Sequence, residues 1–255
     1  MTSDKVIAVE NLSKRYIIGG DGGKGDGLRH VIENAVRAPI SWMRSRARKN
    51  GAAYEEFWAL RDINLEINRG EIVGIIGRNG AGKSTLLKIL ASLMRPSTGT
   101  VRVESEGREL SRDERRSRVG WSGPDLAFYP ELTAEQNLAF FRRAAGFASE
   151  RHDLRTRLAA VGLDGSGTAV EHFSTGMRQR LRIAFSFLLD PDVVLLDEPM
   201  AGLDADGREA VHRAVASAAR RGPVIAAATD LEDLPPADAV LEIRGRETVS
   251  GKPKP

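Results

Sequence analysis

The chain has 255 residues, a formal net charge of +3 and a sequence pI near 9.3. This length supports a hydrophobic core without covalent cross-links, and the absence of cysteine excludes disulfides and cysteine-based metal sites. No apolar run approaches the roughly 20 residues that span a bilayer, and the first residues lack the core of a secretion signal. We therefore expect a cytosolic chain that does not itself cross a membrane.

Short apolar segments alternate with helical stretches along the chain, which predicts an α/β sheet. The expected strands are 6–9, 72–76, 101–103, 193–196, 224–227 and 239–243. The expected helices are 85–94, 131–145, 152–161, 176–189 and 205–220. We interpret residues 1–255 as a single domain in which residues 126–190 form an inserted helical subdomain.

A basic amphipathic insertion is predicted at residues 19–57. Its apolar residues fall on one face of a helix, Pro39 should break or kink that helix, and residues 44–49 carry four positive charges. Two interpretations remain open. The segment is either a surface helix with a solvated basic tail, or a docking element for a membrane surface or a partner protein.

A glycine-rich loop follows the strand expected at 72–76 and precedes a helical stretch. In such a loop the backbone N–H groups surround phosphates, and the following helix adds the positive end of its dipole. Lys83 supplies a cation, and the Ser84 hydroxyl is placed to ligate Mg²⁺. A purely structural glycine loop is the alternative. The residues that this pattern assigns to ATP are Gly77, Asn79, Gly80, Ala81, Gly82, Lys83, Ser84 and Thr85.

Two carboxylates, Asp197 and Glu198, end the apolar strand at 193–196. Asp197 is placed to hold Mg²⁺ directly or through water, and Glu198 is placed to orient or deprotonate the water that attacks the γ-phosphate. A strand that simply ends in solvated acids is the alternative. Together with the glycine-rich loop, the pair predicts an Mg-ATP site.

The segment Phe173-Ser174-Thr175-Gly176-Met177-Arg178-Gln179-Arg180 resembles the signature sequence of ABC-transporter ATP-binding subunits, and the resemblance runs from Val6 to Gly251. It implies a P-loop NTPase with a RecA-like core, an antiparallel β subdomain and a helical subdomain. It also implies that Ser174, Gly176 and Met177 contact the γ-phosphate of a nucleotide held by a second subunit. Without the resemblance, the segment reads equally well as a helix N-cap.

The same resemblance assigns further residues. Tyr16 matches the aromatic residue that stacks on adenine, although Trp58 is an alternative, and Asp204 matches an acidic residue that bridges the two subunits. Two positions depart from the family. Asp125 lies where a glutamine is expected and is interpreted as a Mg²⁺- or water-facing group, and Thr229 lies where a histidine is expected. Because Thr229 brings no positive charge to the γ-phosphate, we expect slow ATP turnover.

The resemblance further implies partners and a location. We expect a transmembrane permease subunit, a second nucleotide-binding subunit in a homodimer, and a membrane-peripheral position on the cytoplasmic face of the inner (plasma) membrane. No nucleic acid partner is expected. A soluble ABC protein acting on DNA or ribosomes, and a regulatory subunit that binds ATP with little turnover, are the alternatives.

The cargo expectation depends on three features: the Ser-Thr-Gly-Met signature, the insertion at 19–57 followed by residues 56–62, and residues 129–133. These resemble ATPases that export polysaccharides such as O-antigen or teichoic acid. From residue 118 onward the chain is less similar to the polysaccharide group and shares features with drug and antibiotic exporters, which remain the alternative.

Overall fold

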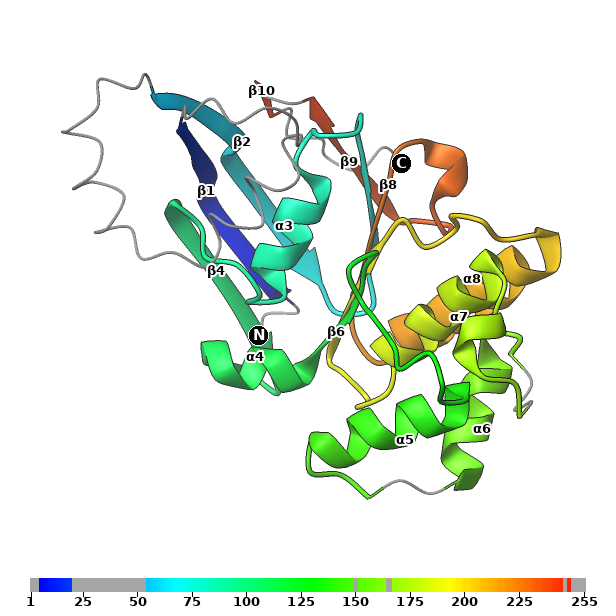
Figure 1. The fold of residues 1–255 in the computed structure, drawn as a ribbon. Helices are drawn as coiled ribbons and strands as arrows, with labels where there is room; N and C mark the ends of the chain where they lie inside the picture. The colour runs from blue at the N-terminus through cyan, green and yellow to red at the C-terminus, as the bar shows by residue number, and fades with distance from the viewer. Residues whose placement is uncertain (1–4, 20–53, 149–150, 164–166, 245–246, 249–255) are drawn as a thin grey trace.

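The computed structural model describes residues 5–19, 54–148, 151–163, 167–244 and 247–248, and these residues form two β-sheets with helices packed against them (Figure 1). The first sheet is antiparallel and has the order β2-β1-β4-β5. Its strands are β1 (Lys5–Gly19), β2 (Tyr54–Asn68), β4 (Thr98–Ser105) and β5 (Arg108–Glu109).

The second sheet has the order β10-β9-β3-β8-β7-β6 and is parallel except for β10 at one edge. Its strands are β3 (Ile72–Ile76), β6 (Val119–Ser122), β7 (Val193–Asp197), β8 (Val224–Ala228), β9 (Ala239–Arg244) and β10 (Glu247–Thr248). The predicted α/β class is therefore confirmed.

Six α-helices are described. They are α3 (Lys83–Leu90), α4 (Arg112–Arg118), α5 (Ala134–Ala144), α6 (Arg151–Ala160), α7 (Thr175–Ser186) and α8 (Ala205–Ala219). Two 3₁₀ turns, Val170–His172 and Leu231–Asp233, lie between them and the strands. None of these helices has the length and apolar character needed to cross a bilayer.

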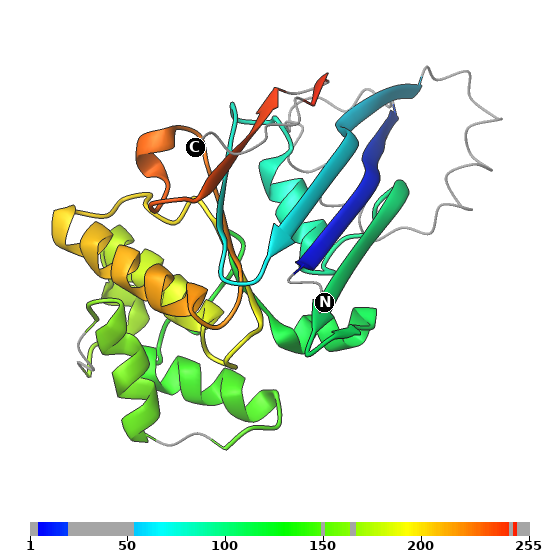
Figure 2. The ribbon, with the colours of Figure 1, turned by 180° about the vertical axis from the view of Figure 1, so that it is seen from behind.

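Both faces of the parallel sheet are buried, each in a different hydrophobic core. Val193 and Leu195 of β7 pack with α3 and the antiparallel sheet, whereas Val194 and Leu196 pack with α7 and α8. Figure 2 shows α7 and α8 on the side of the parallel sheet opposite the antiparallel sheet. This double burial explains why the strands read as continuous apolar runs in the sequence.

Most element ends differ from the predicted ones by one to a few residues. The helix expected from residue 85 begins at Lys83, and the strand expected at 6–9 extends to Gly19. The sequence analysis did not predict α4, which has no buried residue and depends on a capping box between Ser111 and Glu114. A helix without a buried face produces no apolar periodicity to detect.

The insertion predicted at 19–57 falls largely outside the described residues. The two strands that flank it are described, and Gly19 at the end of β1 pairs with Tyr54 at the start of β2. The chain therefore leaves the antiparallel sheet and returns to it at neighbouring positions.

Candidate nucleotide site

The predicted phosphate-binding residues meet at the carboxyl edge of the parallel sheet. Gly77 follows β3, Glu198 follows β7 and Thr229 follows β8, and these three strands are neighbours. Loops at this edge of an open α/β sheet form the usual ligand crevice. The fold therefore brings together groups that are far apart in the sequence.

The glycine-rich loop has a backbone shape that requires glycine. Gly80 and Gly82 have φ angles of 82° and 108°, which side chains rarely adopt. A Cβ atom on Gly82 would lie 2.4 Å from the carbonyl oxygen of Ala59. Around Gly80 no atom lies within 4 Å of the corresponding position, so the loop is open on that side.

Lys83 is held at the start of α3 and is only 5% exposed. Its Nζ donates a hydrogen bond of 2.7 Å to the carbonyl oxygen of Gly77 and lies 3.6 Å from Oε1 of Glu198. The ammonium group is thus fixed against the loop and beside the predicted catalytic carboxylate. This arrangement suits the neutralisation of phosphate charge at the mouth of the loop.

Asp197 is buried beside the Ser84 hydroxyl, but among the described residues neither of its carboxylate oxygens has a hydrogen bond of good geometry. Burial raises the pKa of Asp197, and the nearby Glu198 charge raises it further, while the Ser84 hydroxyl and the charges of Lys83 and Lys88 oppose the rise. A buried carboxylate without a partner is costly. Mg²⁺ held between Asp197, Ser84 and phosphate oxygens would compensate for this cost, so the residues fit the ion.

No cluster of three or more acidic or histidine side chains suited to a metal ion occurs in the part of the chain that the structure describes. This agrees with the chemistry of Mg²⁺, which keeps waters and substrate phosphates as ligands instead of an all-protein cage.

Glu198 adopts a left-handed backbone conformation with a φ of 51°. Its Oε1 lies 3.2 Å from the Thr229 hydroxyl, which also lies 3.2 Å from Oδ1 of Asn79. Both neighbouring oxygens are acceptors, and a hydroxyl has one proton, so Thr229 donates to one of them at a time. Thr229 therefore connects the glycine-rich loop with the predicted catalytic carboxylate.

Asp125 forms an ion pair with Lys88 of α3, with 2.9 Å between Oδ2 and Nζ. The sequence analysis assigned Asp125 to Mg²⁺ or water and did not single out Lys88. The structure instead shows Lys88 near both Asp125 and Asp197, because its charge also lowers the pKa of Asp197. Spacing within α3 alone gives no signal for this pairing.

Tyr16 and Trp58 have different surroundings. The Tyr16 hydroxyl donates to Sδ of Met94 at 3.1 Å, and burial raises the pKa of Tyr16, while the Thr85 hydroxyl and Lys88 oppose the rise. Tyr16 therefore lies beside the helix that carries the glycine-rich loop. Two guanidinium groups lie over the ring of Trp58, that of Arg15 at 5.5 Å and that of Arg61 at 5.9 Å from the ring centroid.

Ser174 and Asp204 are helix N-caps. The Ser174 hydroxyl accepts from the N–H of Met177 at 3.2 Å, and the Asp204 carboxylate accepts from the N–H of Gly207 at 2.8 Å. Gly176 approaches the Asp204 turn closely, because a Cβ on it would lie 2.9 Å from the carbonyl oxygen of Gly202.

The signature residues do not join the glycine-rich loop of the same chain. The helix α7 belongs to the core on one face of the parallel sheet, and α3 belongs to the core on the other face. Figure 1 shows the two helices on opposite sides of the sheet. A single chain therefore provides two separate halves of the predicted nucleotide contacts.

Gln179 is a residue of this region that the sequence analysis quoted within the signature segment but did not single out. It is 6% exposed, and its Nε2 donates to the backbone carbonyls of Glu198 at 3.0 Å and Pro199 at 3.3 Å. The only sequence signal for the role of Gln179 is that a large polar side chain occurs among the mostly apolar buried positions of α7.

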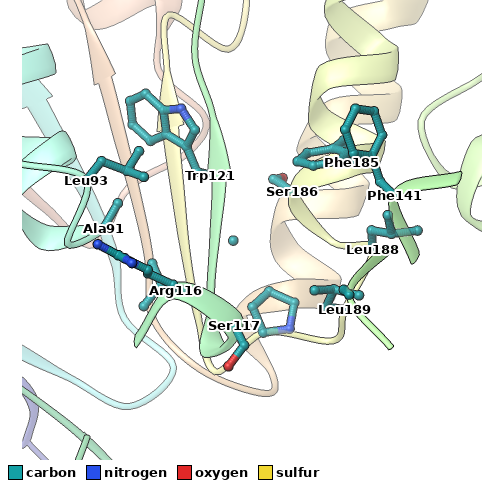
Figure 3. A pocket seen from close by; sticks show the side chains of 14 residues that line it. Ala91, Leu93, Arg116, Ser117, Trp121, Phe141, Phe185, Ser186, Leu188 and Leu189 are labelled. Carbon is teal, nitrogen blue, oxygen red and sulfur yellow. The ribbon is translucent and has the colours of Figure 1, made fainter. Parts of the chain in front are cut away.

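A separate cavity of about 270 Å³ lies at the seam between the two cores, and we name it the seam pocket. Figure 3 shows Leu93 and Trp121 on one side and Phe141, Phe185 and Leu188 on the other. Its lining is mostly apolar. The seam pocket contains none of the predicted nucleotide residues.

The parallel sheet, the glycine-rich loop with Lys83 and Ser84, and the buried Asp197 beside Glu198 define a P-loop NTPase. Residues 60–201 match the family model described as ABC transporter, and the chain belongs to that family. The dimeric structure of MJ0796, a bacterial ABC transporter cassette, covers 95% of this chain and 96% of its own with a TM-score of 0.70 at 21% identity, and so supports the fold.

The curated relatives have several kinds of transport in their names. The chain is 40% identical over 152 residues to the ABC transporter ATP-binding protein NatA of Bacillus subtilis, covering 57% of this chain and 61% of NatA. It is 36% identical over 177 residues to the daunorubicin resistance ATP-binding protein DrrA3 of Streptomyces coeruleorubidus, covering 68% of this chain and 55% of DrrA3. The chain thus spans less than two thirds of the length of each of these two relatives. Proteins named as import ATP-binding proteins also match the chain.

Proposed function

We propose that this chain is the ATP-hydrolysing motor subunit of an ABC exporter. The observation that carries the proposal is the convergence of Lys83, Glu198 and Thr229 beside the buried, unpartnered Asp197 at one edge of the sheet. Each group has a role in phosphoryl transfer that matches its chemistry.

In this mechanism the glycine-rich loop and Lys83 bind the phosphates and offset their charge. Ser84 and Asp197 would hold Mg²⁺, which would supply charge stabilisation to the transferring phosphoryl group. Glu198 orients the attacking water and accepts its proton. Thr229 holds the Glu198 carboxylate through its hydroxyl and adds no cation, so turnover is slower than with a histidine at this place.

We also propose that the working unit is a homodimer. Support comes from the separation of the signature residues from the glycine-rich loop on opposite faces of the sheet. In an antiparallel arrangement of two copies, Ser174 and Gly176 of one copy complete the site of the other. The exposed N-terminus of α7 provides the N–H groups for this contact.

The seam pocket is the proposed docking site for a cytosolic helix of a transmembrane permease, which places the chain at the cytoplasmic face of the plasma membrane. Leu93, which lines the pocket, is 51% exposed, and Phe140 and Tyr129 are 44% and 45% exposed. The ring of Phe140 lies 5.4 Å from that of the pocket residue Phe141. Exposed apolar side chains at and beside an apolar pocket are typical of an interface.

Loss of the permease from co-purification in Leu93→Asp, with ATP binding retained, is the expected result, because Leu93 lines the pocket and is 51% exposed. Leu231→Asp is the matched control, because Leu231 is 60% exposed and does not line the pocket. Equal retention of the permease by both variants would contradict docking at this pocket.

Two cargo classes remain candidates. The names of relatives such as DrrA3 support drug or antibiotic export. Lipid-linked polysaccharide export depends on the sequence features at 19–57, 56–62 and 129–133 and on no named relative among those compared. Transport assays in membrane vesicles containing the permease, with a drug panel and a lipid-linked glycan, separate the two.

The test of the central proposal is ATP hydrolysis by the full chain with and without its permease. We expect Mg-dependent hydrolysis that Glu198→Gln abolishes while ATP binding persists. Binding without turnover in the parent chain would instead favour a regulatory subunit, the alternative that the missing histidine at Thr229 supports.

A further inference from the structure

We propose that Gln179 is a positioning residue that holds the Glu198 turn in its reactive geometry, and this inference rests on the proposed role of Glu198 in hydrolysis. Gln179 lies in α7 within the signature segment, about one helical turn after Gly176, and is 6% exposed. It reaches the end of β7 from the opposite side to α3.

The hydrogen bonds of Gln179 fix which way its amide points. Nε2 donates to the carbonyl oxygens of Glu198 and Pro199, at 3.0 Å and 3.3 Å. On the other side, Oε1 accepts from Nη1 of Arg182 at 3.3 Å. Carbonyls only accept and a guanidinium only donates, so the flipped amide would lose every one of these bonds.

The turn that Gln179 contacts needs support because of its backbone conformation. Glu198 has a φ of 51°, in the left-handed region that residues with side chains adopt only when their surroundings impose it. The N–H of Glu198 donates to the carbonyl oxygen of Ala227 in β8 at 2.8 Å. Its carbonyl oxygen accepts from Gln179. Both the N–H group and the carbonyl group of Glu198 are therefore hydrogen-bonded. These two bonds fix the backbone from which the side chain projects.

The hydrogen bonds around Gln179 extend to the loop after β6. Nε of Arg182 donates to the carbonyl oxygen of Leu126 at 3.4 Å, next to Asp125. Leu126, Arg182, Gln179 and Glu198 are thus connected by successive hydrogen bonds.

A purely structural role is the competing explanation, and Asn137 provides the comparison. This amide is fully buried, accepts from the N–H of Tyr129, and donates to carbonyls of Tyr129, Leu132 and Thr133. None of these partners belongs to the nucleotide site. Substitution of Asn137 therefore reports the effect of losing a buried amide by itself.

The experiment measures single-turnover ATP hydrolysis, MgATP affinity and the thermal midpoint of the full chain for Gln179→Leu, Gln179→Glu and Asn137→Leu. In Gln179→Glu the shape is kept, but the carboxylate cannot donate to the Glu198 carbonyl. We expect both Gln179 variants to hydrolyse bound ATP about a hundredfold more slowly with unchanged MgATP affinity. Asn137→Leu lowers the thermal midpoint and leaves the rate per folded molecule unchanged.

Parent-like rates in the Gln179 variants overturn the inference, as does a rate loss matched by an equal loss of MgATP affinity. Where Gln179→Leu does not fold, Gln179→Glu alone decides. Glu198→Gln is measured in parallel. Sustained hydrolysis by Glu198→Gln refutes the proposed function, whereas its inactivity together with parent-like Gln179 variants refutes only the positioning role.

Discussion

The Thr229 hydroxyl lies 3.2 Å from Oε1 of Glu198, so the residue that occupies the expected histidine position contacts the predicted general base directly. The same hydroxyl lies 3.2 Å from Oδ1 of Asn79 in the glycine-rich loop. This geometry joins the base and the loop through one small side chain.

Replacement of Thr229 by valine should slow ATP hydrolysis about ten- to a hundredfold, because a hydrogen bond to a charged group contributes about 1.5–3 kcal/mol. Thr229→Ser keeps the hydroxyl and should stay near the parent rate. Thr229→His should exceed it, since an imidazole reaches the γ-phosphate. The steady-state kcat of the three variants measures these effects. If Thr229→Val hydrolyses ATP as fast as Thr229→Ser, the hydrogen bond to Glu198 has no part in the mechanism.

Asp197→Asn should stabilise the nucleotide-free chain by about 1 kcal/mol or more, because it removes a buried charge whose pKa is raised by burial despite the opposing Ser84 hydroxyl and Lys83 charge. The same change should weaken Mg-dependent ATP binding. Denaturant unfolding and nucleotide titration with and without Mg²⁺ measure the two effects.

Asp192→Asn is the control for the Asp197 change. Asp192 is partly exposed and its Oδ2 lies 2.8 Å from Nε of Arg118, so the loss of this ion pair should destabilise the chain slightly. Stabilisation by both changes would point to a general charge effect and not to the Asp197 site.

The ion pair between Lys88 and Asp125 should contribute at most about 1 kcal/mol, because both side chains are partly exposed. A double-mutant cycle with Lys88→Met and Asp125→Asn measures the coupling free energy, which should shrink as salt increases. A coupling that is large and insensitive to salt would show that the pair is more strongly desolvated than its exposure indicates.

Glu114 should make stability depend on acid pH. Hydrogen bonds from Arg108 and then Ser111 lower the pKa of Glu114 from 4.5 to about 2. Because the folded pKa lies below the unfolded one, the stabilisation is complete above pH 4.5 and is lost as pH falls towards 2. The difference in unfolding midpoint between the parent and Glu114→Gln should therefore shrink across this window, and a constant difference would contradict it.

The parts of the fold that were predictable are those with a repeated local signal. The strand at 72–76 was predictable because it is a continuous apolar run, and the helix following Asp204 was predictable because its apolar residues recur at helical spacing. The glycine-rich loop and the Asp197-Glu198 pair were found because their chemistry demands consecutive residue types.

What the sequence did not reveal depends on contacts between distant segments. Lys88 meets Asp125, and Gln179 meets Glu198, only after strands β6 and β7 are placed beside each other. Nothing in the local pattern of α3 or α7 specifies those partners. The strand β2 was missed for a related reason, because its pairing with β1 contains several register shifts that interrupt simple alternation.

The pairing of Gly19 with Tyr54 has a consequence for how the chain can be altered. Two strand ends that already face each other need only a short turn to join them, and loop-closure entropy grows slowly with length. The antiparallel sheet is therefore a permissive attachment point. Segments of very different size and chemistry can be exchanged between these two strand ends, by evolution or by engineering, without altering the residues of the nucleotide site.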